Sequence, residues 1–324
     1  MRLLSHPILC NYYLTYRCNA TCPFCDIWEK PSQYATLENA THNLRDLKKL
    51  GVKVIDFTGG EPLLNRALPE FLKLAKGLGF ITTVTTNGLL YPKHSDEING
   101  LVNMLHFSLD SHDKDFHDHL RGVPCFSAVM TSLDIAQHLG EKPDILFTVT
   151  SENIFHIENV YENITKPRKL MLLLNPIFSY PGLEIKNQLN TEHLKILSEW
   201  GQKKGVYLNE AFVQLRKDGG NHISNPVCKA ASSCVVISPD NMLLLPCYHL
   251  GKEKYPIQNN LYNLWHSTEI HRQIKLEGRY QECEGCTINC YFQPSFAVEM
   301  NSYFWKALPS TLKYGKKMLV EKLG

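Results

Sequence analysis

The apolar positions in the first half of the chain alternate between two spacings. Short apolar runs rich in β-branched residues predict six strands, at Ile8–Thr15, Val52–Thr58, Phe80–Thr86, Met104–Leu109, Asp144–Thr150 and Leu170–Ile177. Apolar residues at helical spacing lie between several of these runs, at Leu37–Leu50, Leu68–Leu78 and Phe126–Leu139. Apolar strands separated by helices are typical of a parallel sheet covered on both faces. We therefore expect an α/β fold, a partial (β/α)6 TIM-like barrel, with its site at the carboxyl ends of the strands.

The pattern changes beyond about residue 185. It predicts an amphipathic helix over Thr191–Lys204 that Thr191 caps, a strand over Val206–Gln214, and a helical segment over Leu261–Leu276. Two short apolar runs around Pro239-Asp240-Asn241 predict a β-hairpin. We expect four parts: a core barrel over 1–185, a bridging helix and strand over 186–225, a small cysteine-rich α+β domain over 226–295, and a tail over 296–324.

The tail carries a basic amphipathic pattern. One face of a helix would hold Leu308, Leu312, Gly315, Leu319 and Leu323, and residues 302–324 have five lysines against the single acid Glu321. Such a helix can lie on an anionic membrane surface. The alternatives are a helix docked on the barrel and a solvated tail.

Composition narrows the choice of partners and compartment. The 324 residues include 34 Lys and Arg and 32 Asp and Glu, so the net charge is +2 and gives no reason to expect a nucleic-acid partner. The first residues show no signal-peptide pattern, and the chain has no apolar run of about 18 residues. We expect a cytoplasmic protein, peripheral to the membrane if the tail binds lipid.

Eleven cysteines are many for such a chain. Nine fall into two groups, at 18–25 and 228–290, while Cys10 and Cys125 stand alone and are expected to be core residues. In a reducing compartment grouped cysteines indicate metal binding rather than disulfides.

The first group is Cys18-x3-Cys22-x2-Cys25, directly after the first predicted strand. Three thiolates on one loop can hold three corners of a cubane iron–sulfur cluster and leave the fourth iron open to a small molecule. Zinc is the alternative, although structural zinc more often takes two cysteine or histidine pairs.

This spacing, with an aromatic residue before the last cysteine, resembles the signature of the radical S-adenosylmethionine (SAM) enzymes. The resemblance implies that Cys18, Cys22 and Cys25 hold a [4Fe-4S] cluster whose open iron binds SAM. Reduction of the cluster would then cleave SAM to a 5′-deoxyadenosyl radical that takes a hydrogen atom from substrate. It also implies a reductant such as flavodoxin or ferredoxin.

Other predicted strand ends carry matching residues. Gly59-Gly60-Glu61-Pro62 resembles the family motif that binds the SAM amine, and glycines allow a close backbone approach. Asn87 and Ser108 match positions that contact the SAM ribose and carboxylate, although such residues also cap helices. Arg121 is the expected partner of the SAM carboxylate, because a guanidinium bonds a carboxylate in two places.

Three histidines lie beside these positions. His112, His117 and His119 are expected to be a solvated helix start rather than ligands.

The second cysteine group resembles the SPASM auxiliary-cluster domain or its shorter relative, the twitch domain. The resemblance implies at least one auxiliary iron–sulfur cluster, of the [4Fe-4S] type, held by Cys228, Cys234, Cys247 and Cys290. Cys283 and Cys286 are alternative ligands of that cluster or of a partial second one. The last group departs from the full pattern, and a zinc knuckle is the alternative.

The sequence thus predicts a radical SAM enzyme that acts on an unidentified peptide, small molecule or lipid. It assigns no catalytic residue beyond the cluster. The rival is a non-catalytic protein, either a metal-stapled binding module or an electron-transfer protein, which would not need the motif at Gly59–Pro62.

Overall fold

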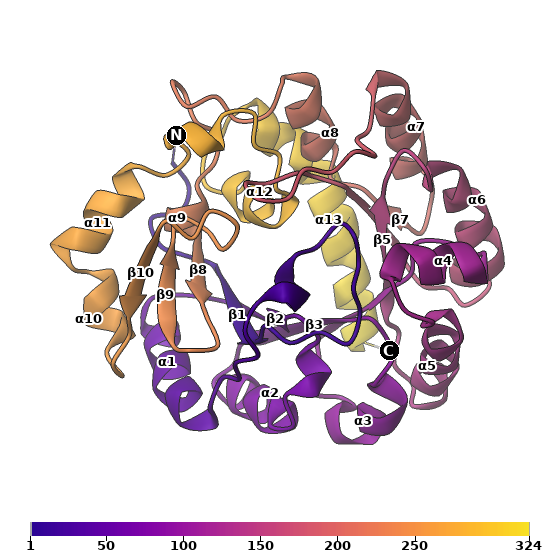
Figure 1. Cartoon of the computed structure of the whole chain (residues 1–324), viewed down its shortest axis with the longest axis horizontal. Helices are drawn as coiled ribbons and strands as arrows, with labels where there is room; N and C mark the ends of the chain where they lie inside the picture. The colour runs from indigo at the N-terminus through magenta and orange to yellow at the C-terminus, as the bar shows by residue number, and fades with distance from the viewer. Residues whose placement is uncertain (1, 324) are drawn as a thin grey trace.

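A computed structural model describes residues 2–323, with side chains up to Met318. Its centre is one ten-stranded sheet in the order β10-β9-β8-β1-β2-β3-β4-β5-β6-β7 (Figure 1). The strands are β1 Leu9–Thr15, β2 Val54–Gly59, β3 Ile81–Thr86, β4 Met104–Ser108, β5 Asp144–Val149, β6 Leu172–Pro176, β7 Val206–Tyr207, β8 Cys234–Ile237, β9 Met242–Leu245 and β10 Glu253–Pro256. Neighbouring strands are parallel from β8 through β7, and the pairs β8–β9 and β9–β10 are antiparallel. The six predicted strands and the α/β barrel are confirmed.

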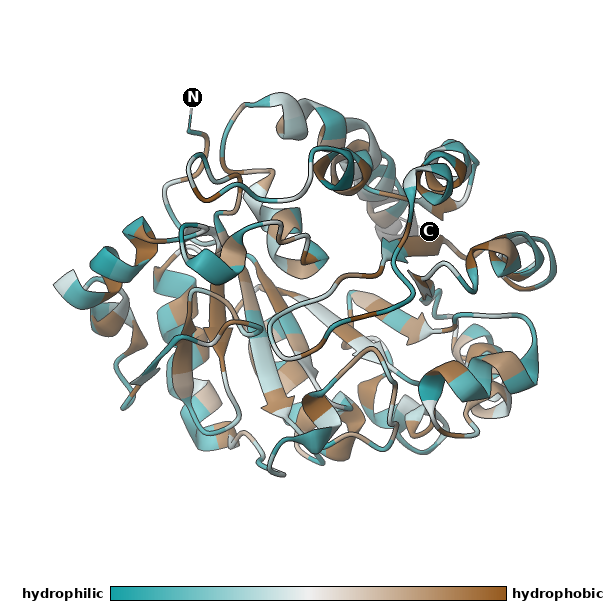
Figure 2. Ribbon diagram, turned by 45° about the horizontal axis from the view of Figure 1, so that its top comes forward, coloured by the Kyte–Doolittle hydropathy of each residue, from teal (hydrophilic) through white to brown (hydrophobic). Residues whose placement is uncertain are grey.

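Helices surround the sheet. They are α1 Leu37–Lys49, α2 Leu68–Gly77, α3 Tyr91–Ile98, α4 Lys114–Arg121, α5 Phe126–His138, α6 Ile157–Val160, α7 Thr191–Gly201, α8 Glu210–Lys217, α9 Ala230–Ser233, α10 Leu261–Trp265, α11 Thr268–Lys275, α12 Asn289–Ser295 and α13 Ser302–Leu323. Figure 2 shows apolar residues concentrated on the strands and on the helix faces that meet them. Buried Cys10, Tyr12 and Leu14 of β1 belong to the core between sheet and helices, whereas Tyr13 belongs to a second core on the inner face.

The hairpin of the cysteine-rich segment continues the barrel sheet. Strand β8 pairs in parallel with β1, with Leu9 opposite Cys234 and Tyr12 opposite Ile237. The expected hairpin is present, and its strands β8 and β9 lie in the same sheet as the barrel strands. Both cysteine groups are therefore attached to the same sheet. The predicted domain boundaries remain a prediction.

Three element predictions in the second half need correction. The strand expected over Val206–Gln214 is only Val206–Tyr207, because Asn209 accepts a hydrogen bond from the amide of Ala211 and starts α8. Helix α7 is capped by Asn190 rather than Thr191, through a capping box with His193. The helical segment over Leu261–Leu276 is two helices, since Ser267 caps α11 and interrupts the run.

The tail forms helix α13, which packs against α8 and β7 (Figure 1). Buried Ala307 and Ser310 lie on its docked face, and Tyr314 on that face donates a hydrogen bond of 2.5 Å to the Asp144 carboxylate. The predicted apolar face is not the docked one, because Leu312 is 62% exposed. The side chains of Leu319 and Leu323 lie outside the described ones. Within residues 2–323, no helix is long and apolar enough to cross a membrane.

Candidate functional site

The loop that carries Cys18, Cys22 and Cys25 follows β1 at the carboxyl edge of the sheet. Cys22 is buried, and Cys18 and Cys25 are half-buried. The amide of Cys25 donates to the carbonyl oxygen of Cys22 at 3.1 Å, which closes a tight turn between these two thiols. Three other segments, each at the end of a strand or helix, hold this loop in place.

The first of these segments is the end of β2. The amide of Gly60 donates to the carbonyl of Thr15 at 2.8 Å, and the amide of Glu61 donates to the carbonyl of Arg17 at 2.9 Å. A Cβ atom on Gly60 would lie 2.1 Å from the Arg17 carbonyl oxygen, and Gly59 has a φ of 141°. The two glycines therefore permit the close approach of β2 to the cysteine loop. The amides of Gly60 and Glu61 are already bonded, and a bound ammonium group, which only donates hydrogen bonds, would need carbonyl oxygens here.

Glu61 is buried beneath the loop. Its carboxylate accepts hydrogen bonds from the hydroxyl of Thr86 at 2.8 Å and from the amides of Asn87 at 2.9 Å and Leu63 at 3.2 Å. Burial raises the pKa of Glu61 to about 7, although these donors partly offset the effect. Glu61 thus mainly links the ends of β2 and β3 through hydrogen bonds.

Asn87 forms the second attachment. Its side-chain nitrogen Nδ2 donates to the Asn19 side-chain oxygen at 2.8 Å and lies 3.9 Å from the Cys18 sulfur. Ser108 lies buried at the carboxyl end of β4, on the same edge of the sheet. The structure therefore places both residues at the expected edge, and their contacts to SAM stay a prediction.

The end of α4 forms the third attachment. The Arg121 carbonyl accepts from the amide of Thr21 at 3.1 Å, and the Cys22 thiol lies 3.7 Å from the same oxygen. Gly122 has a φ of 68°, and a Cβ atom there would lie 2.3 Å from the Thr21 hydroxyl. This glycine therefore ends α4 and also lets the helix touch the loop.

The guanidinium of Arg121 is buried under the cysteine loop. It forms an ion pair of 2.6 Å with Asp110 and lies 5.5 Å from the centre of the Phe24 ring. Burial raises the pKa of the Cys22 thiol, and the charge of Arg121 opposes that rise. Arg121 therefore balances negative charge at the cysteine loop, and its use by a SAM carboxylate would be in competition with Asp110.

The thiols of this loop resist ionisation when no metal is bound. Burial raises the pKa of Cys18 to about 12 and that of Cys25 to about 11. A metal must displace these protons, so binding of iron releases them and is favoured by higher pH.

His117 is a correction to the predicted solvated histidines. His112 and His119 are exposed, but His117 is fully buried, and burial lowers its pKa to about 3. Its Nδ1 accepts from the amide of Asp110 at 3.1 Å, and its Nε2 lies 3.3 Å from the sulfur of buried Cys125. The error arose because α4 is amphipathic and turns this one histidine toward the barrel. Cys125 is the core residue expected.

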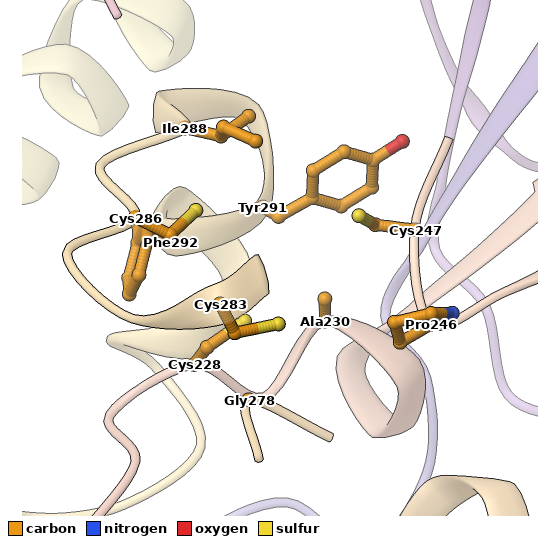
Figure 3. A pocket seen from close by; sticks show the side chains of 10 residues that line it. All are labelled: Cys228, Ala230, Pro246, Cys247, Gly278, Cys283, Cys286, Ile288, Tyr291 and Phe292. Carbon is orange, nitrogen blue, oxygen red and sulfur yellow. The ribbon is translucent and has the colours of Figure 1, made fainter. Parts of the chain in front are cut away.

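The second candidate site is a small cavity of about 20 Å³. Figure 3 shows the sulfur atoms of four cysteines around it, namely Cys228, Cys247, Cys283 and Cys286, with Tyr291 closing one side. These cysteines come from the loop before α9, the end of β9 and the turn before α12. Four thiols facing one enclosed apolar space match the needs of a four-thiolate cluster.

The cysteines around this cavity differ in part from the ligand set predicted from sequence, which remains a prediction. Cys234 and Cys290 do not line the cavity, whereas the alternative ligands Cys283 and Cys286 do. Cys234 is buried in β8, where its thiol donates to the Val235 carbonyl at 3.5 Å. Cys290 is exposed and lies 3.8 Å from Nε2 of His249. Side chains along a strand or helix point in different directions. Sequence spacing alone therefore does not reveal which cysteines face the same site.

Among the described residues, no three His, Cys, Asp or Glu side chains lie close enough to bind one metal ion. A zinc ion would draw its ligands to about 2.3 Å from one centre. The four thiols instead surround a space.

Sequence reasoning missed the aromatic residues between the two sites. Tyr13 of β1 stacks on Tyr248 with ring centres 4.3 Å apart, and the Tyr248 hydroxyl accepts from Lys30 at 2.8 Å. The amide of Tyr248 donates to the Tyr291 hydroxyl at 2.9 Å. The one signal for them is their place next to cysteines: Tyr248 follows Cys247, and Tyr291 follows Cys290.

Comparison with known proteins covers the segment that carries the first site. Residues 12–164 match the model of the radical SAM superfamily. A curated relative, the S-adenosylmethionine-dependent nucleotide dehydratase RSAD2 of Siniperca chuatsi, is 27% identical over 53% of this chain and 49% of its own. The chain thus spans about half the length of that relative.

Two further comparisons extend beyond the barrel. The AdoMet-dependent heme synthase of Methanosarcina barkeri is 26% identical over 93% of this chain and 97% of its own. The solved structure of Streptococcus suis SuiB bound to S-adenosylmethionine has a TM-score of 0.68 and 20% identity, over 84% of this chain and 68% of that chain. The likeness to SuiB shows a shared fold. Residues 12–164 of this chain, with their three-cysteine loop at the carboxyl edge of a parallel barrel, therefore form a radical SAM superfamily domain.

Proposed function

We propose that this protein is a radical SAM enzyme. The observation that carries the proposal is the loop of Cys18, Cys22 and Cys25, held at the carboxyl edge of the sheet by the ends of β2, β3 and α4. When bound, a [4Fe-4S] cluster with SAM supplies a 5′-deoxyadenosyl radical on reduction. The protein's part is to fix the loop, bind SAM and exclude water, because the position of the substrate decides which C–H bond is attacked.

The SAM contacts remain proposals. The carbonyl groups near Gly59 and Gly60 are suited to the SAM amine, since an ammonium group only donates hydrogen bonds and a carbonyl oxygen can accept two. Asn87, Ser108 and Arg121 lie around the same edge and are proposed for the ribose and carboxylate. Glu61 supports Asn87 from below rather than facing the site.

We propose that a second iron–sulfur cluster, of the SPASM or twitch type, occupies the cavity of Cys228, Cys247, Cys283 and Cys286. Its support is the convergence of four thiols from three separate segments on one enclosed space. Four protein thiolates would complete its coordination and favour a role in electron transfer over substrate binding.

The test is anaerobic reconstitution of the full chain, followed by counts of iron and sulfide and a SAM cleavage assay with dithionite. About eight irons per chain and release of 5′-deoxyadenosine are expected, as two cubane clusters hold four irons each. Cys22→Ala should abolish cleavage and keep about four irons. Cleavage at the wild-type rate in that variant would contradict the proposal.

The second cluster has its own matched pair of variants. Cys286→Ala should lose about four irons, while Cys234→Ala, which lacks contact with the cavity, should keep all of them. Loss of iron in Cys234→Ala with full iron in Cys286→Ala would restore the ligand set predicted from sequence.

Substrate and partners are not assigned by likeness. The relatives are named for three different reactions: a nucleotide dehydratase, a heme synthase and a GTP 3′,8-cyclase. A flavodoxin or ferredoxin as reductant, a cytoplasmic location, and contact of α13 with a membrane through exposed Trp305 and Leu312 remain predictions.

A further inference from the structure

Arg216, in the last turn of α8, carries a charge that no acid neutralises. Its guanidinium donates to the carbonyl oxygen of Phe212 at 3.1 Å, and to those of Pro176 and Ile177 at 3.0 Å each, at the end of β6. Among the described side chains it forms no ion pair with a carboxylate. An arginine side chain stays protonated in proteins. The fold therefore holds a fixed positive charge here that carbonyl dipoles alone balance.

The same guanidinium contacts the turn that forms one side of the four-cysteine cavity. Its Nη2 also donates to the carbonyl oxygen of Thr287 at 3.4 Å. Thr287 stands between Cys286 and Ile288, which both line the cavity (Figure 3). Among the described ionisable side chains, Cys286 is the one whose charge acts on that of Arg216. The unneutralised charge thus lies beside a thiol of the second site.

The turn is held in a fixed position by Asn221, which is fully buried in the loop after α8. Its backbone amide donates to the carbonyl of Cys286 at 3.0 Å, and its side-chain nitrogen donates to the carbonyl of Cys283 at 3.1 Å. Its side-chain oxygen accepts from the amide of Cys228 at 3.1 Å. Three of the four cavity cysteines are thus bonded to the segment that follows Arg216, so the fold sets the distance from this charge to the thiols.

A second cation near these thiols is already paired. Glu282 directly precedes Cys283 and forms an ion pair of 2.7 Å with Lys252. The charge of Lys252 is therefore balanced by a carboxylate, whereas that of Arg216 remains for the cavity.

We propose that Arg216 is the counter-charge of the second cluster and raises its reduction potential, an inference that rests on the cluster proposed above for the four-cysteine cavity. Four thiolates outweigh the positive charge of a cubane core, and one-electron reduction adds a further negative charge. A fixed cation nearby stabilises the reduced form more than the oxidised form. The electron comes from the reductant that serves the enzyme, and Arg216 itself neither gains nor loses a proton.

The test measures the potential of the second cluster alone. Every protein carries Cys22→Ala, which removes the first cluster and should leave about four irons. The full chain is reconstituted anaerobically and titrated with dithionite at controlled potential, and the reduced cluster is followed by electron paramagnetic resonance. Arg216→Gln should shift the reduction equilibrium about ten-fold toward the oxidised form, which is a potential about 59 mV lower for a one-electron couple.

Two further variants separate the charge of Arg216 from its hydrogen bonds and from its place on α8. Arg216→Lys keeps the positive charge and loses the planar fork of donors, so the potential should stay close to that of the parent. Lys217→Gln is the matched control, because it removes a charge from the next residue of the same helix. Lys217 is exposed, so solvent and salt screen it and its loss should leave the potential unchanged.

An unchanged potential in Arg216→Gln, or an equal fall in Arg216→Lys, would overturn the role of this charge and leave the second cluster intact. Loss of iron from both Arg216 variants would mean that the residue only holds the cysteine turn to β6, and would also overturn the proposal. A Cys22→Ala parent that binds no iron would overturn the second cluster and this inference with it. SAM cleavage by the wild-type chain reports on the first site separately.

Discussion

At the scale of single residues, the motif residues shape the cysteine loop and are also proposed to bind SAM. The sequence motifs alone do not separate these two roles. Gly60, Asn87 and Gly122 each contact the backbone or side chains of the cysteine loop, so they shape the loop before any ligand arrives. Glu61 supports this arrangement through three hydrogen bonds to the ends of β2 and β3. Substitution of these residues is therefore expected to change loop geometry and SAM binding together.

Glu61 should make stability depend on pH. Its pKa is about 7 in the folded protein against 4.5 when unperturbed, so the folded state holds this proton more tightly than the unfolded chain. The resulting stability is complete below pH 4.5 and is lost as the pH rises through 7. In the wild-type protein, this effect should lower the free energy of unfolding by about 2 kcal/mol between pH 5.5 and 8. Glu61→Gln should not show this loss.

Urea unfolding of the cluster-free protein at several pH values measures this effect. Glu70→Gln, on an exposed turn of α2, serves as the control and should leave the pH dependence unchanged. An unaltered slope in Glu61→Gln would show that this carboxyl ionises normally in the fold.

At the scale of elements, the cysteine loop is an extension of the sheet. The bonds from Gly60 to Thr15 and from Glu61 to Arg17 continue the pairing of β2 with β1 beyond the strand ends. The loop that would hold the first cluster is thus tied to the paired strands β1 and β2 of the barrel. Its position depends on close backbone contact rather than on side-chain packing.

Gly60→Ala should show this dependence. The added Cβ would lie 2.1 Å from the Arg17 carbonyl oxygen, so the loop must move away. We expect loss of about four irons on reconstitution and at least a ten-fold loss of SAM cleavage, with the second cluster retained.

Gly77→Ala is the matched control, because a Cβ at this position of α2 meets nothing within 4 Å. It should keep iron content and cleavage and slightly stabilise the helix. Normal iron and activity in Gly60→Ala would mean that the loop adapts without cost.

The same scale shows what the sequence could predict. The six strands of the barrel were predictable, because each is a short apolar run rich in β-branched residues. The loop of Cys18, Cys22 and Cys25 was predictable for a different reason, because its three cysteines lie close together in the chain. The second site was not, because its thiols come from three segments, and only folding shows that Cys283 rather than Cys234 faces the cavity. The strand at β7 was predicted too long, because the cap at Asn209 starts helix α8 inside the apolar pattern.

At the scale of the whole molecule, α13 couples the end of the chain to the inside of the barrel. Lys317 forms an ion pair with Asp144 of β5, and Tyr314 donates a hydrogen bond to the same carboxylate. The Asp144 side chain is only 2% exposed and that of Lys317 only 14%. A buried carboxylate that loses its partner is costly, so this helix contributes to stability as well as to covering the barrel.

Lys317→Met should lower the free energy of unfolding by about 3 kcal/mol, because it leaves the Asp144 charge buried with fewer partners. Asp144→Asn in the same chain should recover part of that loss, which a double-mutant cycle by urea unfolding would measure. Lys316→Met, on the exposed side of the same helix turn, is the control and should change little. Equal effects of Lys316→Met and Lys317→Met would argue against the buried pair.

The pairing of β8 with β1 has a consequence for the speed of internal electron tunnelling. Tunnelling rates fall exponentially with distance, so a hinge between two redox sites would make the rate fluctuate with every domain motion. Here Cys247 follows the hairpin that starts at β8, the first cysteine loop follows β1, and Tyr13 stacks on Tyr248 between them. One continuous sheet thus fixes the distance between the two sites. The rate of electron tunnelling between any redox centres bound there should therefore not vary with domain motion.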